Sequence, residues 1–244
     1  HDLITADDCA VQDPLHVELN ARVRNWMRAH DIAAYDEVNH SGCVRNLMTR
    51  KGFKSGELMV VLVTLGEELP FEAELLASLS DLPITTLVQN INDERTNRIL
   101  GATNRVLLGE GVIRDKIHEL EFEISPLSFF QNNPTQTDVL YSSALEYAEL
   151  TGNETVFDIY CGIGTISLFL AGKAAKVVGI ESVESAISDA RRNAALNGIE
   201  HTEFHVGKAE QLMPELHAQG VTADVVVMDP PRKGCDKAVL QTLV

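Results

Sequence analysis

The residues best placed to do chemistry begin with a glycine turn. Gly162 and Gly164 stand in the run Asp-Ile-Tyr-Cys-Gly-Ile-Gly-Thr that ends at Thr165. Glycines at this spacing let the backbone turn tightly and approach a ligand closely before a helix begins. A dinucleotide fingerprint would want a third glycine where Ser167 stands. The turn therefore predicts close approach to a ligand, and a plain strand-to-helix turn stays open as the alternative.

A carboxylate at the end of the next apolar run points to a nucleoside. Glu181 closes the run Val-Val-Gly-Ile-Glu that begins at Val177. A carboxylate in this position can accept hydrogen bonds from both hydroxyls of a ribose, in NAD and S-adenosylmethionine sites alike. It identifies a nucleoside rather than a reaction. Further on, the segment Gly-Lys-Ala-Glu ending at Glu210 could line an adenine pocket, although Glu210 suits the first turn of a helix equally well.

The fourth candidate is the segment Asp-Pro-Pro-Arg from Asp229 to Arg232. It follows an apolar run directly, and its two prolines make the exit rigid. Enzymes that methylate amino nitrogens favour an aromatic ring after such prolines, because the ring stacks on the flipped base. Arg232 replaces that ring, which argues for a different target atom and puts a guanidinium where RNA phosphate could lie. A rigid turn with a surface arginine is the alternative.

Alternating strands and helices after about Ser125 would position these residues. Such alternation implies a parallel sheet with helices on its faces, and ligands of such sheets bind beyond the carboxyl ends of the strands. We therefore expect the chemistry just after residues 159, 180, 206 and 228. The expected helices are 135–150, 165–173, 183–197 and 208–218, and the expected strands are 155–160, 176–181, 202–206 and 224–228.

The first half of the chain has another organisation. Apolar residues recur at helical spacing from Leu15, just after Pro14, which suits a first helical turn. A short helix is expected at 71–80, and strands at 43–50, 57–64, 84–91 and 119–124. We therefore predict a central α+β domain over 1–125 and a second domain over 126–244.

Composition limits the kinds of partner. The formal charge of −16 argues against a surface that grips nucleic acid by itself, because phosphate binding needs clustered Lys and Arg. The four cysteines show no CxxC spacing, and no apolar run reaches transmembrane length. We expect a cytoplasmic protein that has no membrane partner and no evident obligate protein partner.

Upstream of the predicted sheet stands Ser-Pro-Leu-Ser-Phe-Phe-Gln from Ser125 to Gln131. With this segment, the chain resembles the TrmA/RumA family of RNA (uracil-5-)-methyltransferases. That family is known by Ser-Phe-Phe-Gln before a helix, the Asp-x-Tyr/Phe-Cys-Gly-x-Gly turn, a Glu at the second strand end and Asp-Pro-Pro-Arg at the fourth. The resemblance covers about 125–244 by motif. It implies an α/β fold, a Rossmann-like class I methyltransferase sheet truncated at its carboxyl end and preceded by a smaller α+β domain.

The resemblance also implies a ligand and a set of site residues. The cofactor is S-adenosylmethionine, and the residues similar to the family's cofactor contacts are Gln131, Tyr160, Gly162, Gly164, Thr165, Glu181, Ala209 and Asp229. Arg232 is the expected RNA contact. Cys9 resembles the last of four cysteines that hold a 4Fe-4S cluster in many members, and an ordinary thiol is the alternative.

The implied reaction methylates a uridine in RNA, with 23S ribosomal RNA as the first candidate and transfer RNA as the second. The family attacks C6 with a cysteine thiolate, and C5 then takes the methyl group to give 5-methyluridine. His1 and Val244 look like cuts through a longer protein, so the catalytic cysteine is expected after Val244. Cys235 stands at a position that the family does not use for catalysis, and Cys161, inside the cofactor turn, is expected to be structural. One alternative is an inactive cofactor-binding module. Another is a cytosine-C5 or carbon-target rRNA methyltransferase of a different family, which would share the sheet but should lack the Ser-Phe-Phe-Gln segment.

Overall fold

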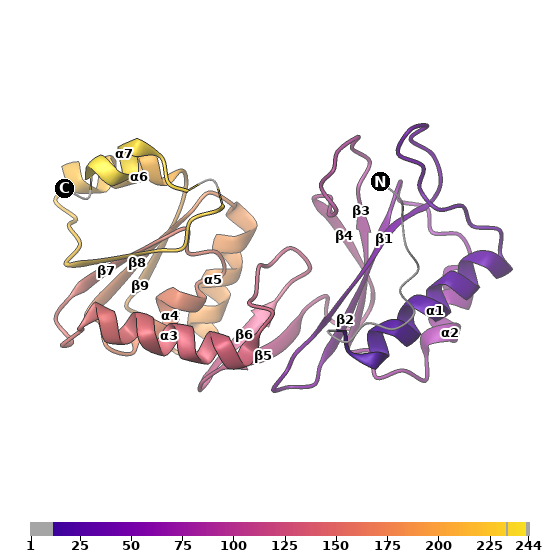
Figure 1. Ribbon diagram of the computed structural model, residues 1–244, viewed down its shortest axis with the longest axis horizontal. Helices are drawn as coiled ribbons and strands as arrows, with labels where there is room; N and C mark the ends of the chain where they lie inside the picture. Colours follow the sequence, from indigo (N-terminus) through magenta and orange to yellow (C-terminus); the bar gives the residue numbers. More distant parts are fainter. Residues whose placement is uncertain (1–11, 233, 243–244) are drawn as a thin grey trace. The chain divides into compact units, whose positions relative to one another are not determined.

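The structure is a computed structural model that describes residues 12–232 and 234–242. The chain divides into two compact units (Figure 1). The first takes the residues up to Gly52 together with Gly56–Ile113, and the second takes Phe53–Ser55 and the chain from Arg114 onward.

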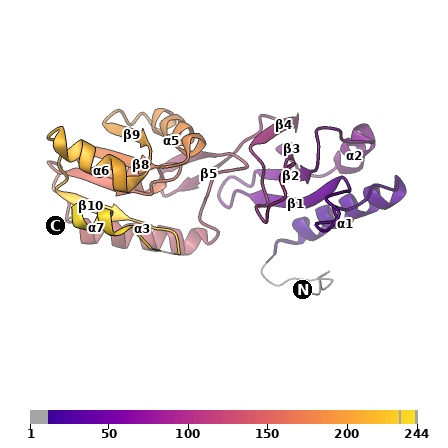
Figure 2. The ribbon, with the colours of Figure 1, turned by 90° about the horizontal axis from the view of Figure 1, so that it is seen from above.

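The first unit is a four-stranded sheet with two helices on one side. Its strands β1 (Val44–Lys51), β2 (Leu58–Thr64), β3 (Thr86–Ile91) and β4 (Thr103–Leu108) lie in chain order, and only the pair of β2 and β3 is parallel. Helices α1 (Pro14–Ala29) and α2 (Glu72–Leu79) share one core with the leucines of β2 (Figure 2). Every residue of β2 is buried, as its uninterrupted apolar run predicts.

The second unit contains a four-stranded parallel sheet in the order β10-β7-β8-β9. Its strands are β7 (Thr155–Ile159), β8 (Lys176–Glu181), β9 (Thr202–Val206) and β10 (Val225–Met228). Helices α3 (Pro134–Ala148) and α4 (Thr165–Ala171) pack on one face, and α6 (Ala209–Ala218) and α7 (Lys237–Thr242) pack on the other (Figure 1). Helix α5 (Glu184–Leu196) contacts β8 and β9. The predicted α/β fold is confirmed, and the predicted helices and strands of this half all form.

A hairpin of β5 (Ile113–Ile117) and β6 (Leu120–Ile124) packs with the second unit. Asn193 of α5 and Asn197, which follows α5 directly, hold strand β6 through their side chains. The Asn197 side chain bonds both the N–H and the C=O of Glu121, at 2.9 and 2.7 Å, and Oδ1 of Asn193 accepts the Glu123 N–H at 2.8 Å. The compact units therefore divide at 113/114 and not at 125. The functional domain boundary near 125 stays a prediction.

Two strands of the structure, β4 and β5, are not among those expected from the sequence. Five of the six side chains of β4 are exposed, so no burial pattern marks the strand in the sequence. It forms because its backbone pairs with the edge of β3. No helix among the described residues is long and apolar enough to cross a membrane.

Candidate functional site

The carboxyl ends of the four parallel strands open on one edge of the second unit's sheet. Backbone hydrogen bonds tie the strand exits to one another in sheet order. Asp229 N–H donates to Ile159 O at 3.4 Å, and Tyr160 N–H donates to Ile180 O at 2.9 Å. Gly207 N–H donates to the backbone oxygen of Glu181 at 2.9 Å. The residues predicted to follow the strands, Asp229, Tyr160, Glu181 and Gly207, therefore form one row.

The glycine turn after β7 has the backbone that its sequence requires. Tyr160, Gly162 and Gly164 all have positive φ, at 70°, 54° and 82°. A Cβ at Gly164 would lie 3.2 Å from the side chains of Ala190 and Phe204, whereas a Cβ at Gly162 would meet no atom within 4 Å. Gly164 is thus needed for packing as well as for conformation, and Gly162 leaves open space beside the backbone.

Helix α4 begins at Thr165, immediately after the turn. The Thr165 hydroxyl lies 2.8 Å from the hydroxyl of Tyr141, a side chain of α3 that is 2% exposed. Burial raises the pKa of the Tyr141 phenol to about 12, so this tyrosine stays neutral. The contact holds α3 against the start of α4.

Gln131 is half-buried in the segment that leads into α3, which begins at Pro134. Contacts from α5 and from β6 hold the residues just before Gln131. The Ser128 hydroxyl donates to Asp189 of α5 at 2.8 Å, and the Phe130 ring lies 6.1 Å from the ring of Phe122. Among the described residues, Gln131 has no hydrogen bond to the strand-end row. The structure therefore fixes its segment without joining its side chain to the row.

Glu181 is half-buried at the end of β8. Its Oε1 accepts hydrogen bonds from the Ser182 hydroxyl and the Val183 N–H, both at 3.0 Å. These bonds orient the carboxylate at the strand exit. Ala209 is buried at the first position of α6, directly after the exit of β9.

One buried carboxylate at the site had no role assigned from the sequence. Asp158, on β7, is 1% exposed, and its Oδ2 accepts a 2.6 Å hydrogen bond from the Ser167 hydroxyl. Its Oδ1 has no partner among the described residues. Burial raises the pKa of the Asp158 carboxyl to about 6, and the charges of Asp229 and Glu181 add to the rise. The signal in the sequence is its place as the first residue of the glycine segment.

Comparison with known proteins gives this arrangement a context. A family described as a methyltransferase domain matches residues 150–242. An uncharacterized RNA methyltransferase of Halalkalibacterium halodurans is 50% identical over 246 residues, covering 100% of this chain and 54% of that protein. One from Caldanaerobacter subterraneus subsp. tengcongensis is 46% identical over 246 residues, with the same 100% and 54% coverage. The chain is homologous to RNA methyltransferases.

A solved structure agrees with this assignment. The Pyrococcus abyssi tRNA (uracil-54, C5)-methyltransferase, in complex with S-adenosyl-L-homocysteine, superposes with a TM-score of 0.80. It is 26% identical, and the match covers 99% of this chain and 57% of that one. The predicted resemblance to RNA (uracil-5-)-methyltransferases is confirmed. The chain spans about half the length of the curated relatives it matches.

Two of the described cysteines of this RNA methyltransferase homologue are disfavoured as thiolates, and the third, Cys235, is half-buried. Burial raises the pKa of the Cys161 thiol well above its usual range, and burial raises that of Cys43 as well. Cys235 packs beside Tyr160, and burial together with this contact raises the pKa of the Tyr160 phenol. Cys9 lies outside the described residues. Within 12–232 and 234–242, no group of three or more His, Cys, Asp or Glu could hold a metal ion.

Two further features lie apart from the row. Arg232 is exposed beyond β10, in the turn that Asp229 begins.

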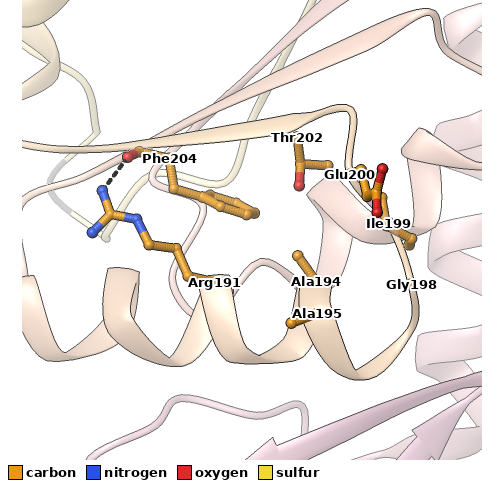
Figure 3. A pocket seen from close by; sticks show the side chains of 8 residues that line it. All are labelled: Arg191, Ala194, Ala195, Gly198, Ile199, Glu200, Thr202 and Phe204. Atoms are coloured by element: carbon orange, nitrogen blue, oxygen red, sulfur yellow. Dashed lines mark hydrogen bonds between the residues drawn. The ribbon is translucent and has the colours of Figure 1, made fainter.

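A shallow pocket of about 380 Å³ lies between the end of α5 and the start of β9 (Figure 3), where Arg191 donates to Phe204 O at 2.6 Å. None of the predicted site residues lines this pocket. It faces the amino end of β9, so the chemistry of the strand exits does not use it.

Proposed function

We propose that this chain is the cofactor-binding part of an enzyme that transfers a methyl group from S-adenosylmethionine to C5 of a uridine in RNA, with 23S ribosomal RNA as the first candidate substrate. The observation that carries the proposal is the row of strand exits beside an open glycine turn. The likeness of the whole chain to a uracil-C5 methyltransferase that holds S-adenosyl-L-homocysteine supports it.

Each residue of the row has a role in this proposal. The Glu181 carboxylate, already oriented by Ser182 and Val183, accepts hydrogen bonds from the ribose hydroxyls. Gly162 lets the backbone approach the ligand, since nothing lies within 4 Å of where its Cβ would be. The start of α6 at Ala209 borders the base.

We assign roles to the remaining predicted contacts as well. Asp229 lies beside the reacting end of the methyl donor, and Tyr160 and Thr165 complete the turn after β7. Gln131 approaches from the segment before α3. Exposed Arg232 offers its guanidinium to an RNA phosphate.

The chemistry that the bound cofactor supplies is a methyl group on a sulfonium. C5 of uracil is a poor nucleophile, so a thiolate adds to C6 and makes C5 electron-rich. After transfer, a base removes the C5 proton and the thiolate leaves. The raised pKa values of Cys161 and Cys43 disfavour them as that thiolate. Because the relatives are about twice as long, we assign the nucleophile to the rest of the full-length protein.

Transfer RNA is the second candidate substrate, favoured by the likeness to the Pyrococcus abyssi enzyme, which acts on tRNA. A 4Fe-4S cluster involving Cys9 stays a prediction for the full-length protein, because no step above needs it. Cytoplasmic localisation and a role in rRNA processing are likewise proposals for the full-length protein.

Two measurements test the proposal. Calorimetry should show that the chain binds S-adenosylmethionine and not NAD, and NAD binding in its place would refute the assignment. The full-length protein, incubated with methyl-labelled cofactor and either 23S rRNA or tRNA, should then yield 5-methyluridine in one of them. Methylation of cytidine or of an exocyclic amine instead would show that the target atom is misassigned.

A further inference from the structure

Asp158 occupies an unusual place for a carboxylate. It lies on β7 between the two neighbouring strands, level with Val227 of β10 and Gly179 of β8. The side chain is 1% exposed, and its Oδ2 accepts a hydrogen bond from the Ser167 hydroxyl. The Ser167 backbone N–H also donates to this carboxylate, and Oδ1 has no partner among the described residues. A buried carboxylate is costly to ionise unless its charge is compensated, and the neutral hydroxyl and N–H of Ser167 offset only part of that cost.

The groups that face Asp158 do not compensate its charge. Acidic residues approach from both neighbouring strands, Asp229 from β10 and Glu181 from β8. From α3, α4 and the glycine turn come Tyr141, Ser167 and Cys161, all neutral side chains near pH 7. Burial, with the charges of Asp229 and Glu181 added to it, raises the pKa of the Asp158 carboxyl to about 6 against the lowering effect of its hydrogen bonds with Ser167. The described residues bring no cation to it.

S-adenosylmethionine, the ligand of the proposed function, carries the kind of positive charge that Asp158 lacks beside it. S-adenosylmethionine carries a positive sulfonium and a positive α-ammonium against one carboxylate, so it has a net positive charge. Its demethylated product has lost the sulfonium charge. A nearby positive charge favours the ionised form of a carboxyl group, and the smaller charge of the product favours it less.

We propose that Asp158 couples methyl-donor binding to proton release in mildly acidic solution, holding a proton in the empty site and losing it to solvent when the cationic donor binds. This rests on the proposed function. The proton returns from solvent when the product dissociates, so no net proton is consumed by Asp158 over one cycle. The same linkage makes the site prefer the methyl donor to the demethylated product, and the preference grows as the pH rises through the range where the empty site titrates.

The test is calorimetry of the chain with S-adenosylmethionine at pH 7.5, 6.0 and 5.5, in pairs of buffers with different ionisation enthalpies. We expect the Kd to rise about fourfold between pH 7.5 and 5.5, and about half a proton to be released per ligand at pH 6.0. S-adenosylhomocysteine should release a smaller fraction of a proton. Asp158→Asn should abolish both the release and the rise in Kd.

Two further variants test whether the effect comes from Asp158, one by removing its hydrogen bond and one as a control. Ser167→Ala removes the hydrogen bond that favours the ionised carboxylate, so the pH dependence should move to higher pH. Glu154→Gln is the matched control, since Glu154 is a half-buried carboxylate beside β7 whose hydrogen bonds with Thr151 hold its pKa at about 2. This variant should leave the proton release and the pH dependence of the Kd unchanged. Thermal unfolding confirms that each variant is folded. If Asp158→Asn does not fold, the inference is tested by whether the pH dependence of the Kd moves to higher pH in Ser167→Ala.

The outcomes separate the two proposals. Tight binding at pH 7.5 without proton release at pH 6.0, or proton release that persists in Asp158→Asn, overturns the inference and leaves the proposed function standing. Absence of any S-adenosylmethionine binding at pH 7.5 overturns the proposed function and this inference with it.

Discussion

The Ser167 hydroxyl donates a 2.6 Å hydrogen bond to Oδ2 of Asp158, and this bond joins the first turn of α4 to the exit of β7. The sequence places a serine where a dinucleotide fingerprint would have its third glycine. In this fold the serine therefore has a specific use, which is to hold a buried carboxylate beneath the glycine turn.

Asp158→Asn should stabilise the chain at the expense of its ligand chemistry. The folded-state pKa of about 6 exceeds the usual 3.8, so the ionised carboxylate destabilises the fold. That cost is absent below the unfolded pKa, grows as the pH rises and is fully present above about pH 6. The variant should gain about 2–3 kcal/mol at pH 8 and about half of that at pH 5. Urea denaturation at pH 8 and pH 5 measures the two gains in unfolding free energy. An equal gain at both pH values would contradict the ionisation of Asp158 as their cause.

Glu181→Gln should weaken S-adenosylmethionine binding by about tenfold or more. The carboxylate accepts hydrogen bonds as an anion, and such bonds contribute about 1.5–3 kcal/mol each. Glu184→Gln is a suitable control because Glu184 is an exposed first-turn residue of α5, three positions along the chain. Calorimetry at pH 7.5 compares the two, and an equal loss in both variants would count against a ribose contact.

Asn197→Ala should loosen the hairpin. The variant leaves the N–H and C=O of Glu121 without their side-chain partner, at a cost of about 1–3 kcal/mol. Amide exchange at Glu121 should accelerate while exchange in β8 stays slow. Asn153→Ala, in an exposed turn, should leave both unchanged. Unaltered protection of Glu121 in Asn197→Ala would show that the bonds do not hold the hairpin.

Gly179→Ala should destabilise the second unit by about 1–3 kcal/mol, because the core around it has no room. An added Cβ would lie 2.6 Å from the Phe204 ring and 2.9 Å from Cys161 Sγ. Gly172→Ala is the matched control. Gly172 has a helical φ of −60° and its nearest contact would be 3.6 Å, so the change should be neutral. Chemical denaturation ranks the two, and a tolerated Gly179→Ala would disprove the close packing.

Much of the second unit could be predicted because local pattern and tertiary environment agree there. The β-branched runs that end at Ile159 and Glu181 are apolar enough to be buried strands in a parallel sheet, and the similar run that ends at Met228 forms a half-buried strand. The helices between them have regular apolar spacing. The edge strand β4 had no such pattern, since its Thr, Asn and Arg side chains face solvent and only pairing with β3 makes it a strand.

The sequence by itself determined which side chains stand at the strand exits, because a parallel sheet brings the carboxyl ends of its strands to one edge whatever the details of packing. Only the tertiary structure decided that Asp158 is buried on the strand between those that lead to Asp229 and Glu181, with one oxygen unpaired among the described residues. It also decided that the β5–β6 hairpin packs with the second unit, through Asn193 and Asn197. The physical reason is that burial and the distance between charges depend on residues far apart in the chain, which no local pattern records.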